Sequence, residues 1–138
     1  MRPAYMTNIG GLIAPKEGLP PLNNAAGTRN GAAIDRLGYF SCTLFAQAGA
    51  EEGSPSARTL DVKLQESDDG STGWTDISGA AITQITAVNT QARKDVNLRG
   101  VKRYIRAVEV VAFTAGTSPK LNSVCQVILG GKDDGLPS

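Results

Sequence analysis

The amino-acid sequence predicts an all-β protein with one domain, built as an antiparallel β-sandwich or barrel. Residues 60–130 consist of short segments in which apolar and polar residues alternate, and turns of small residues separate these segments. Alternation with a period of two is typical of strands that bury one face. The 16 Gly and 7 Pro among 138 residues disfavour long helices, and a chain of this length builds a single hydrophobic core.

Residues 1–31 differ from the rest of the chain and predict an extended arm. Glycine and proline are mixed in this segment without a sustained periodicity. The segment also carries large apolar side chains, including Tyr5, Ile9, Leu12 and Ile13, which a solvated tail normally lacks. We therefore expect an arm that docks on the same protein or on a partner, the alternative being a disordered leader.

The expected strands follow this arm. Residues 60–77 are the clearest hairpin, because a turn rich in Ser, Asp and Gly occupies residues 67–73 between two apolar segments. In chain order, strands are expected at residues 39–46, 60–66, 74–77, 93–98, 104–113 and 123–129, with a weaker segment near residues 82–85. The pattern gives seven or eight strands and no strong helix.

The expected strand at residues 104–113 departs from strict alternation. Glu109 shares the parity of the apolar Ile105 and Ala107, while Arg106 shares that of Val108. A β-bulge near Ala107 or Val108 would turn both charged side chains outward, because one extra residue shifts the facing of everything after it. The alternative is a strand buried on both faces, with Glu109 paired.

The charge pattern argues against a nucleic-acid or membrane partner. Lysine and arginine total 14 against 13 acidic residues, a net charge of +1, so no global field attracts polyanions. Residues 51–76 contain seven acidic and two basic residues, whereas residues 93–106 contain six basic and one acidic residue. The basic segment has Tyr104 as its one aromatic residue, which is poor for stacking nucleic-acid bases. The opposite patches instead predict pairing between neighbouring copies.

Residues that common catalytic and metal sites require are missing from the sequence. The absence of histidine removes the commonest general base and the commonest metal ligand. Acidic pairs such as Glu51–Glu52 are sequence neighbours that would point to opposite faces of a strand, so their carboxyl groups do not converge on one bond. We therefore expect no enzyme activity, no cofactor and no bound metal.

Cys42 and Cys125 both fall on expected strands. Their small number and the lack of an apolar signal segment at Met1–Tyr5 favour buried free thiols over a disulfide. Two cysteines with carboxylates are also far from the usual four-ligand zinc clusters.

Three stretches of the chain have a distinctive sequence: LDVKLQESDDGSTGW at residues 60–74, GAAITQ at residues 79–84 and LRGVKRYIRA at residues 98–107. Together they resemble small structural proteins of tailed bacteriophages, particularly capsid decoration or cement proteins. The resemblance covers about residues 30 to 131, and the N-terminal arm lies outside it.

The resemblance implies a jelly-roll-like, single-domain antiparallel β-sandwich on the outer surface of a virion, made in the cytoplasm of the host bacterium. Its implied partners are the major capsid protein and further copies of itself, as a dimer or trimer at a symmetry axis of the capsid. The implied role is to tie adjacent capsid subunits together. We divide the chain into an arm at residues 1–31, a sandwich domain at residues 32–131 and a polar tail at residues 132–138.

The residues expected to contact the capsid or a neighbouring copy come from the arm and from the basic segment. They are Tyr5, Ile9, Leu12, Ile13, Arg99, Lys102, Arg103 and Arg106. No membrane and no nucleic acid are expected as partners.

Two other functions remain open from the sequence. One is a carbohydrate- or receptor-binding module on a virion, with Trp74, Tyr39 and Tyr104 as stacking platforms. Trp74, however, follows a turn and is predicted to lie in the core, since large aromatic side chains dominate burial. The other is a head-completion or tail structural protein, which would share this composition.

Overall fold

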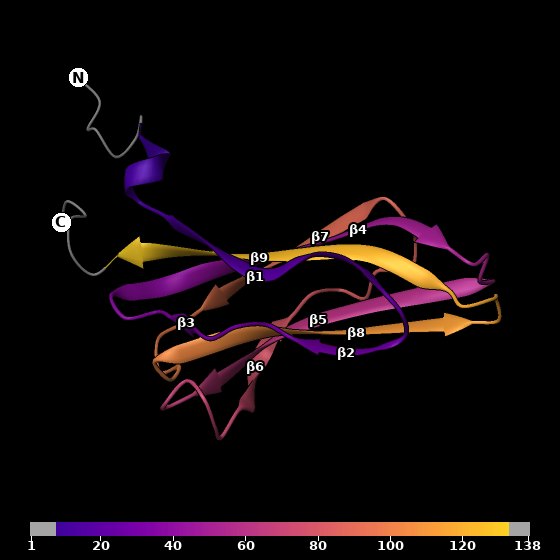
Figure 1. Cartoon of the computed structure of the whole chain (residues 1–138). Helices are drawn as coiled ribbons and strands as arrows, with labels where there is room; N and C mark the ends of the chain where they lie inside the picture. Colours follow the sequence, from indigo (N-terminus) through magenta and orange to yellow (C-terminus); the bar gives the residue numbers. More distant parts are fainter. Residues whose placement is uncertain (1–7, 133–138) are drawn as a thin grey trace.

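Strands dominate residues 8–132, which the computed structural model describes, and a short 3₁₀ turn is the one helical element among them. Figure 1 shows the strands as two layers, with η2 and the end of β9 at the same end of the molecule. The elements are η2 (Ile9–Gly11), β1 (Ala14–Asn24), β2 (Gly27–Asn30), β3 (Ile34–Asp35), β4 (Tyr39–Glu52), β5 (Ala57–Ser67), β6 (Thr75–Ala81), β7 (Thr90–Asn97), β8 (Tyr104–Thr114) and β9 (Lys120–Lys132).

The two layers are antiparallel sheets. Sheet A has four strands in the order β1-β9-β4-β7, and sheet B has the order β2-β8-β5-β6, with β3 also paired to β8. Every pairing between these strands is antiparallel. The predicted fold class, an all-β antiparallel sandwich with one domain, is confirmed.

The strand order is that of a jelly roll. The pairs β1·β9, β2·β8, β4·β7 and β5·β6 are nested like the arms of one long hairpin whose tip lies between β5 and β6. Rolling this hairpin up adds the pairs β4·β9 and β5·β8, which close each sheet. Apart from the β5–β6 hairpin and the β2–β3 connection within sheet B, the connections between these strands cross from one sheet to the other, as in double Greek-key sandwiches.

The core lies between the inner faces of the sheets and is mostly aliphatic. Leu44 and Leu129 of sheet A face Leu60, Leu64 and Ile105 of sheet B, and all five are fully buried. These residues occupy every second position of their strands, which is the alternation that the sequence shows. Each such side chain contributes about 2 kcal/mol by leaving water.

The strands do not follow the division expected at residue 31 between an arm and a sandwich domain. Residues 14–24 form β1, which pairs with β9 along the edge of sheet A, and Leu19 is 1% exposed in the core. The register of β1 shifts between Glu17 and Leu19 and again between Leu19 and Leu22. These irregularities break the period of two, so the sequence of β1 does not read as a strand.

Strand β8 contains no bulge, and Glu109 is buried. The register of β8 with β5 is continuous from Thr114 to Tyr104. The Glu109 side chain is 1% exposed and its Oε1 accepts a hydrogen bond of 2.9 Å from Nε of Arg29 on β2. Of the two alternatives that the sequence left open, the bulge is therefore wrong. Glu109 is buried and paired as the other alternative expects, but the outer face of β8 is not fully buried, since Val110 is 39% exposed.

Glu109 belongs to a wider set of contacts, which we call the buried ion-pair network: Arg29, Glu109, Ser123 and Asn24. The Ser123 hydroxyl lies 3.0 and 3.1 Å from the two Glu109 oxygens, and Asn24 Nδ2 donates to the same hydroxyl at 2.6 Å. Arg29 also donates to the carbonyl of Pro20 at 2.7 Å. The network thereby joins β1, β2, β8 and β9 across both sheets.

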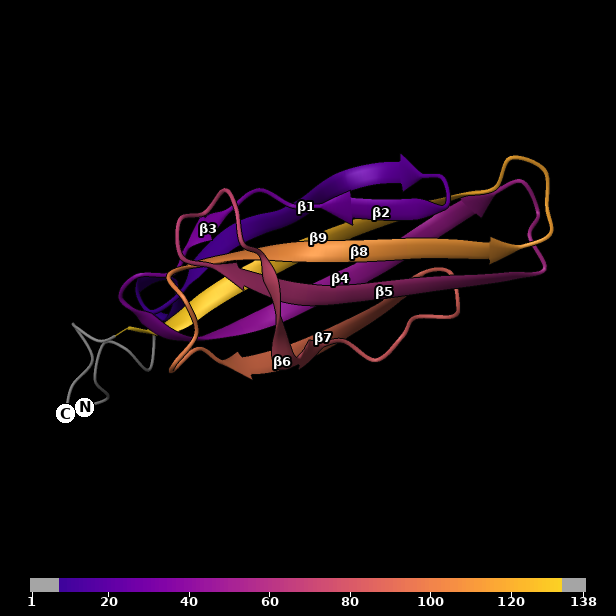
Figure 2. The ribbon, with the colours of Figure 1, turned by 90° about the horizontal axis from the view of Figure 1, so that it is seen from below.

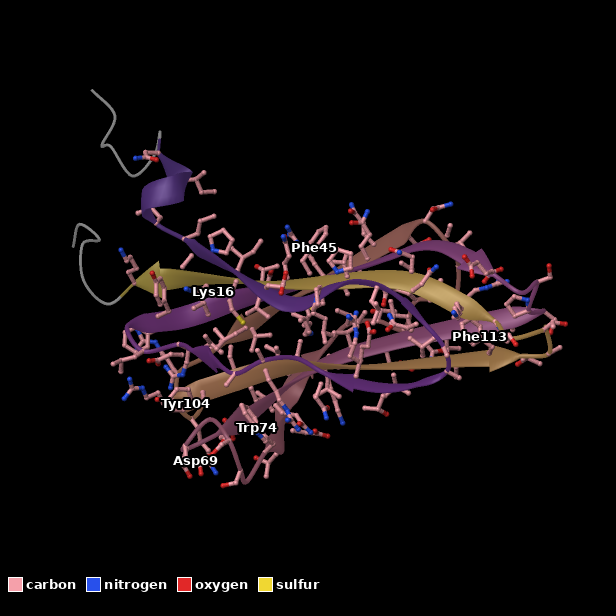
Figure 3. The ribbon with its side chains drawn as sticks, viewed as in Figure 1. Lys16, Phe45, Asp69, Trp74, Tyr104 and Phe113 are labelled. Carbon is pink, nitrogen blue, oxygen red and sulfur yellow. The ribbon has the colours of Figure 1, made fainter. Side chains whose placement is uncertain are left out.

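The two ends of the sandwich close differently (Figure 2). At the end we call the charged end, the β3–β4, β5–β6 and β7–β8 loops meet through charged side chains. At the end we call the loop-linked end, the β4–β5 and β8–β9 loops are joined through the backbone, with Thr117 N–H donating to Gly53 O at 2.8 Å. Figure 3 shows Asp69 and Tyr104 near the charged end and Phe113 at the opposite end.

Candidate functional site

The predicted contact residues of the arm lie at the start of the described chain. Ile9 is in η2 and is 70% exposed, while Leu12 and Ile13 are half-buried just before β1. Tyr5 lies outside the described residues. An exposed isoleucine beside two half-buried apolar residues is a surface that a partner could cover.

Ile13 also borders a groove of about 640 Å³ on the outer face of sheet A. Small residues form part of its lining at Ser41, Gly130 and Gly131, and Ile128 continues the apolar side that Ile13 begins. The remaining lining residues are Cys42, Thr43, Arg93, Asp95, Val96 and Asn97. The groove is open and has both apolar and charged residues along it.

The predicted basic contacts in the β7–β8 loop are engaged within the chain. Arg103 Nη2 lies 2.8 Å from Oδ2 of Asp35, and Arg103 Nε donates to the other carboxylate oxygen at 3.1 Å. Lys102 Nζ lies 3.2 Å from Asp68, and the Lys102 backbone N–H donates to Glu66 at 3.0 Å. The Arg103 guanidinium lowers the pKa of the Asp35 carboxyl, mainly through its hydrogen bond.

Arg99 and Arg106 each lie over an aromatic ring. The guanidinium carbon of Arg99 is 4.8 Å from the centre of the Phe40 ring, and that of Arg106 is 4.5 Å from the centre of the Trp74 ring. Arg106 Nε and Nη2 both donate to Oε1 of Gln65, at 3.0 and 2.8 Å. Such cation–π pairs contribute about 0.5–1 kcal/mol at exposed positions.

These contacts show where the acidic and basic segments of the sequence lie in the fold. The acidic segment at residues 51–76 contains β5, and the basic segment at residues 93–106 ends in the first residues of β8, which is the neighbour of β5 in sheet B. Their charged and polar side chains therefore meet inside one molecule, as Lys102 and Asp68 do. Pairing of opposite patches between copies, which the sequence predicts, does not follow from this arrangement.

Trp74 lies outside the core, and its predicted burial is wrong. The side chain is half-buried at the start of β6, on the outer face of sheet B, where Arg106 covers part of the ring. Trp74 has the same parity as Asp76, which pairs with the outward-facing Gln65. If the pairing of Gln65 with Asp76 were known, the alternation of side chains along the strand would place Trp74 on the outer face of the sheet. The sequence does not show that pairing.

A second hollow, of about 360 Å³, opens on the outer face of sheet B. Val108 and Val110 of β8 and Ala81 and Ile82 beyond β6 give it apolar walls, and Val110 is 39% exposed. The other lining residues are Asp61, Val62 and Lys63. None of the predicted contact residues lines this hollow.

Cys42 and Cys125 are both buried and free. Burial raises the pKa of each thiol to about 12, with further increases from Asp95 near Cys42 and from Glu109 near Cys125. At neutral pH both sulfurs are therefore protonated and pack as small apolar groups.

Among residues 8–132, no group of three or more Cys, Asp or Glu side chains is placed to hold a metal ion. The same part of the chain has no helix long and apolar enough to cross a membrane.

No family model and no curated protein sequence matches this chain. Similar solved structures exist. The PBSX exported protein XepA superposes with a TM-score of 0.62 at 19% identity, over 91% of this chain and 39% of XepA. The SPBc2 prophage-derived protein YomS gives a TM-score of 0.51 at 17% identity, over 85% of this chain and 91% of YomS. A chain from infectious bursal disease virus, Gx strain, gives 0.55 at 8% identity, over 91% of this chain and 34% of that chain.

These likenesses show a shared fold. The chain spans about two fifths of XepA and one third of the bursal disease virus chain, so each of those proteins contains much more than this sandwich.

Proposed function

We propose that this chain is a non-enzymatic virion structural protein that binds the outer surface of a phage capsid and cements neighbouring major capsid subunits. The observation that carries the proposal is the jelly-roll strand order, in which nested pairs join every part of the chain into one block. Jelly rolls are a common architecture of capsid proteins. The fold shared with two prophage proteins and a virus particle supports the same role.

Cementing needs no chemistry and follows from linkage. A protein that binds only the assembled shell stabilises that shell by mass action, and many modest sites add through multivalency. A bridging subunit must also resist deformation, because a soft domain would stretch rather than hold two capsid subunits. The buried ion-pair network and the joined loops at both ends serve this purpose.

The proposed attachment uses the entry to β1 and the rim of the β7–β8 loop. Ile9 is highly exposed, and Leu12 and Ile13 lie beside the groove on sheet A. Arg99 is exposed, and Lys102 and Arg103 keep side-chain exposures of 38% and 49% despite their ion pairs. Both regions lie at the end of the sandwich where β1 begins and β9 ends (Figure 1). A second copy at a capsid symmetry axis is the other proposed partner.

Copy number per particle tests the proposal directly. Quantitative mass spectrometry of purified particles should give hundreds of copies, in a fixed ratio to the major capsid protein. A handful of copies would indicate a head-completion or tail protein instead and would reject the cementing role.

The attachment surface is tested by charge reversal. The triple variant Arg99→Glu, Lys102→Glu and Arg103→Glu should lose binding to empty capsids. The control Lys16→Glu, Lys94→Glu and Lys120→Glu changes exposed lysines that do not line the groove and should bind normally. Circular dichroism establishes that both variants are folded. Equal binding by both variants would exclude the β7–β8 rim.

A shortened chain tests the other half of the attachment surface. Deleting residues 2–12 removes Ile9 and Leu12 but keeps β1, whose loss would open sheet A. Weaker capsid occupancy is expected for this variant. Unchanged occupancy would assign the attachment to the sandwich alone.

A further inference from the structure

A continuous chain of hydrogen bonds crosses the outer face of sheet B. It begins at Arg106, which lies over Trp74 and donates twice to Oε1 of Gln65. Gln65 Nε2 then donates to Oδ1 of Asp76 at 2.9 Å, and Lys63 Nζ donates to Oδ2 of the same carboxylate at 2.9 Å. We call these five side chains the polar row. It contributes nothing to the core and is not part of the proposed capsid surface.

The polar row is fixed in place before any ligand arrives. The Gln65 amide is held at both its oxygen and its nitrogen, so its orientation is set. Hydrogen bonds from Gln65 and Lys63 lower the pKa of the Asp76 carboxyl, which is therefore ionised at neutral pH. Asp76 and Lys63 nevertheless keep side-chain exposures of 58% and 40%, so lone pairs and protons remain accessible to a ligand.

The loop that carries Trp74 is also rigid. Asp69 Oδ1 accepts hydrogen bonds from the backbone N–H groups of Ser71 and Thr72, at 2.9 and 2.8 Å. Gly70 packs on the Tyr104 ring so closely that a Cβ atom there would lie 3.0 Å from Cγ of Tyr104. Figure 3 shows Trp74, Asp69 and Tyr104 gathered on this side of the molecule.

An apolar hollow adjoins the polar row. Lys63 belongs to both, and Val110, which is 39% exposed, lies in the hollow with Ala81. Asp61 on the rim accepts from Gln84 Nε2 at 3.2 and 2.9 Å, so this carboxylate is oriented as well. The surface thus places oriented donors and acceptors beside apolar side chains.

Its charges balance. Arg106 and Lys63 are the cations of the surface and Asp76 and Asp61 are the anions, so the net charge is zero. An anionic ligand would have to displace Asp76 from Lys63, and a cationic one would meet both cations. A ligand with many hydroxyl groups and no charge fits, because each hydroxyl both donates and accepts.

We propose that the outer face of sheet B binds a neutral saccharide through Trp74, the polar row and the adjoining hollow. Arg106, which lies over Trp74, and Val110 are four residues apart on β8, a span of about 13 Å. The C–H groups of one sugar ring would therefore pack on the exposed part of the Trp74 indole, and those of another ring of the same oligosaccharide on Val110. Vicinal hydroxyls would bind Asp76 and Lys63, where hydrogen bonds to charged groups are the stronger kind. The capsid attachment proposed above uses other residues, so the two proposals stand or fall separately.

The chain contains one tryptophan, so intrinsic fluorescence reports on this site without a label. The full chain would be titrated with neutral oligosaccharides of glucose, galactose, mannose and N-acetylglucosamine, up to about 10 mM, which detects binding free energies near −4 kcal/mol. At least one should change the Trp74 emission saturably. Heteronuclear NMR should then show shifts confined to β5, β6 and β8. A polyanion, heparin, serves as the charged comparison and should not bind.

Asp76→Asn and Lys63→Met are the informative variants, because both side chains are exposed and their loss leaves the core intact. Each should weaken saccharide binding about tenfold or more. Phe45→Ala is the matched control, since it removes a half-buried aromatic from the outer face of sheet A. No saturable response to any of these saccharides, a response to heparin alone, or equal losses in Phe45→Ala and Asp76→Asn would each overturn the proposal.

Discussion

Of the ion pairs in this molecule, those of the buried ion-pair network and those of the charged end differ most clearly in how much water reaches them. In the buried ion-pair network, Glu109 is 1% exposed and Arg29 is 18% exposed. At the charged end, Arg103 and Asp35 are 49% and 43% exposed, and Lys102 and Asp68 are 38% and 82% exposed. The distances are similar, at 2.9, 2.8 and 3.2 Å.

Exposure rather than distance decides what each pair contributes. Removing one member of a buried pair leaves an unpaired charge in the interior, whereas water replaces a lost partner at the surface. The buried pair therefore determines whether β1 and β2 stay on the sandwich. The exposed pairs orient loops and contribute little to global stability.

The largest effect is expected from Arg29→Met. This variant leaves the Glu109 carboxylate buried without its cation, so the free energy of unfolding should fall by about 3–5 kcal/mol. Urea unfolding followed by circular dichroism measures the loss. The double variant Arg29→Met and Glu109→Leu should recover most of it, because an apolar pair of similar volume removes the buried charge. A loss below about 1 kcal/mol in the single variant would contradict this view of the network.

The next effect is expected at the loop-linked end, where a backbone hydrogen bond joins the β4–β5 and β8–β9 loops. Gly53 has φ of +83° and a Cβ atom added there would lie 2.4 Å from the Thr117 oxygen. Gly53→Ala should therefore cost about 2–4 kcal/mol, from the backbone conformation and from the clash together. Gly73→Ala is the control, since Gly73 has φ of +67° with nothing within 4 Å, and it should lose only about 1–2 kcal/mol. Equal losses at both sites would mean that the loop contact is unimportant.

A smaller effect is expected for the exposed pair Arg103–Asp35. A double-mutant cycle of Arg103→Ala and Asp35→Ala should give a coupling of about 0.2–1 kcal/mol, which decreases as salt is added. A coupling free energy above about 2 kcal/mol would contradict the view that the exposed pair contributes much less to stability than the buried ion-pair network.

The same pair predicts a pH dependence. Arg103 lowers the pKa of Asp35 below its value in the unfolded chain, about 3.9. The stabilisation is therefore present above about pH 4 and is lost as the pH falls through the folded pKa, where the carboxylate takes up a proton. Acid unfolding of the wild type and of Asp35→Asn should show a difference in stability that is constant above about pH 4 and shrinks as the pH falls below it. If the two proteins showed the same dependence of stability on pH, Asp35 would not contribute to acid unfolding.

The smallest effect is expected on thiol labelling when the exposed pair is broken. Cys42 and Cys125 are buried, with pKa values raised to about 12, so a thiol reagent reaches them only when the sandwich opens. Arg103→Ala should raise the labelling rate less than about sixfold, in line with a loss below about 1 kcal/mol. Arg29→Met should raise it by two orders of magnitude or more. Equal rates in the two variants would contradict the comparison.

The alternating strands were predictable from the sequence, and the edge strand β1 was not. Strands such as β5 alternate strictly, so both their existence and their buried face follow from the residues. In β1, Gly18 and the pair Pro20–Pro21 accompany register shifts that hide the period of two. Its pairing with β9 joins residues about a hundred positions apart, and no local pattern encodes such a pairing.

The site residues show the same limit. The excess of basic residues in the β7–β8 loop was visible in the sequence, but their partners were not, because Asp35 and Asp68 lie on other strands and loops. The polar row could not be predicted from the sequence for a related reason. Its members come from β5, β8 and the start of β6, and only the register of the sheet puts them side by side.

The nested strand order also has a consequence for the time course of folding. Two of the three pairings in sheet A, β1·β9 and β4·β9, require β9, the last described strand to emerge during synthesis. The β5–β6 hairpin can form early, because its strands are adjacent in the chain. Strand β1 cannot pair until β9 has been synthesised, and until then its inner face is exposed to solvent. Proteins with long-range strand pairing of this kind fold in about milliseconds to seconds. Before β9 pairs, the partly folded chain exposes unpaired strand edges of the kind that chaperones bind.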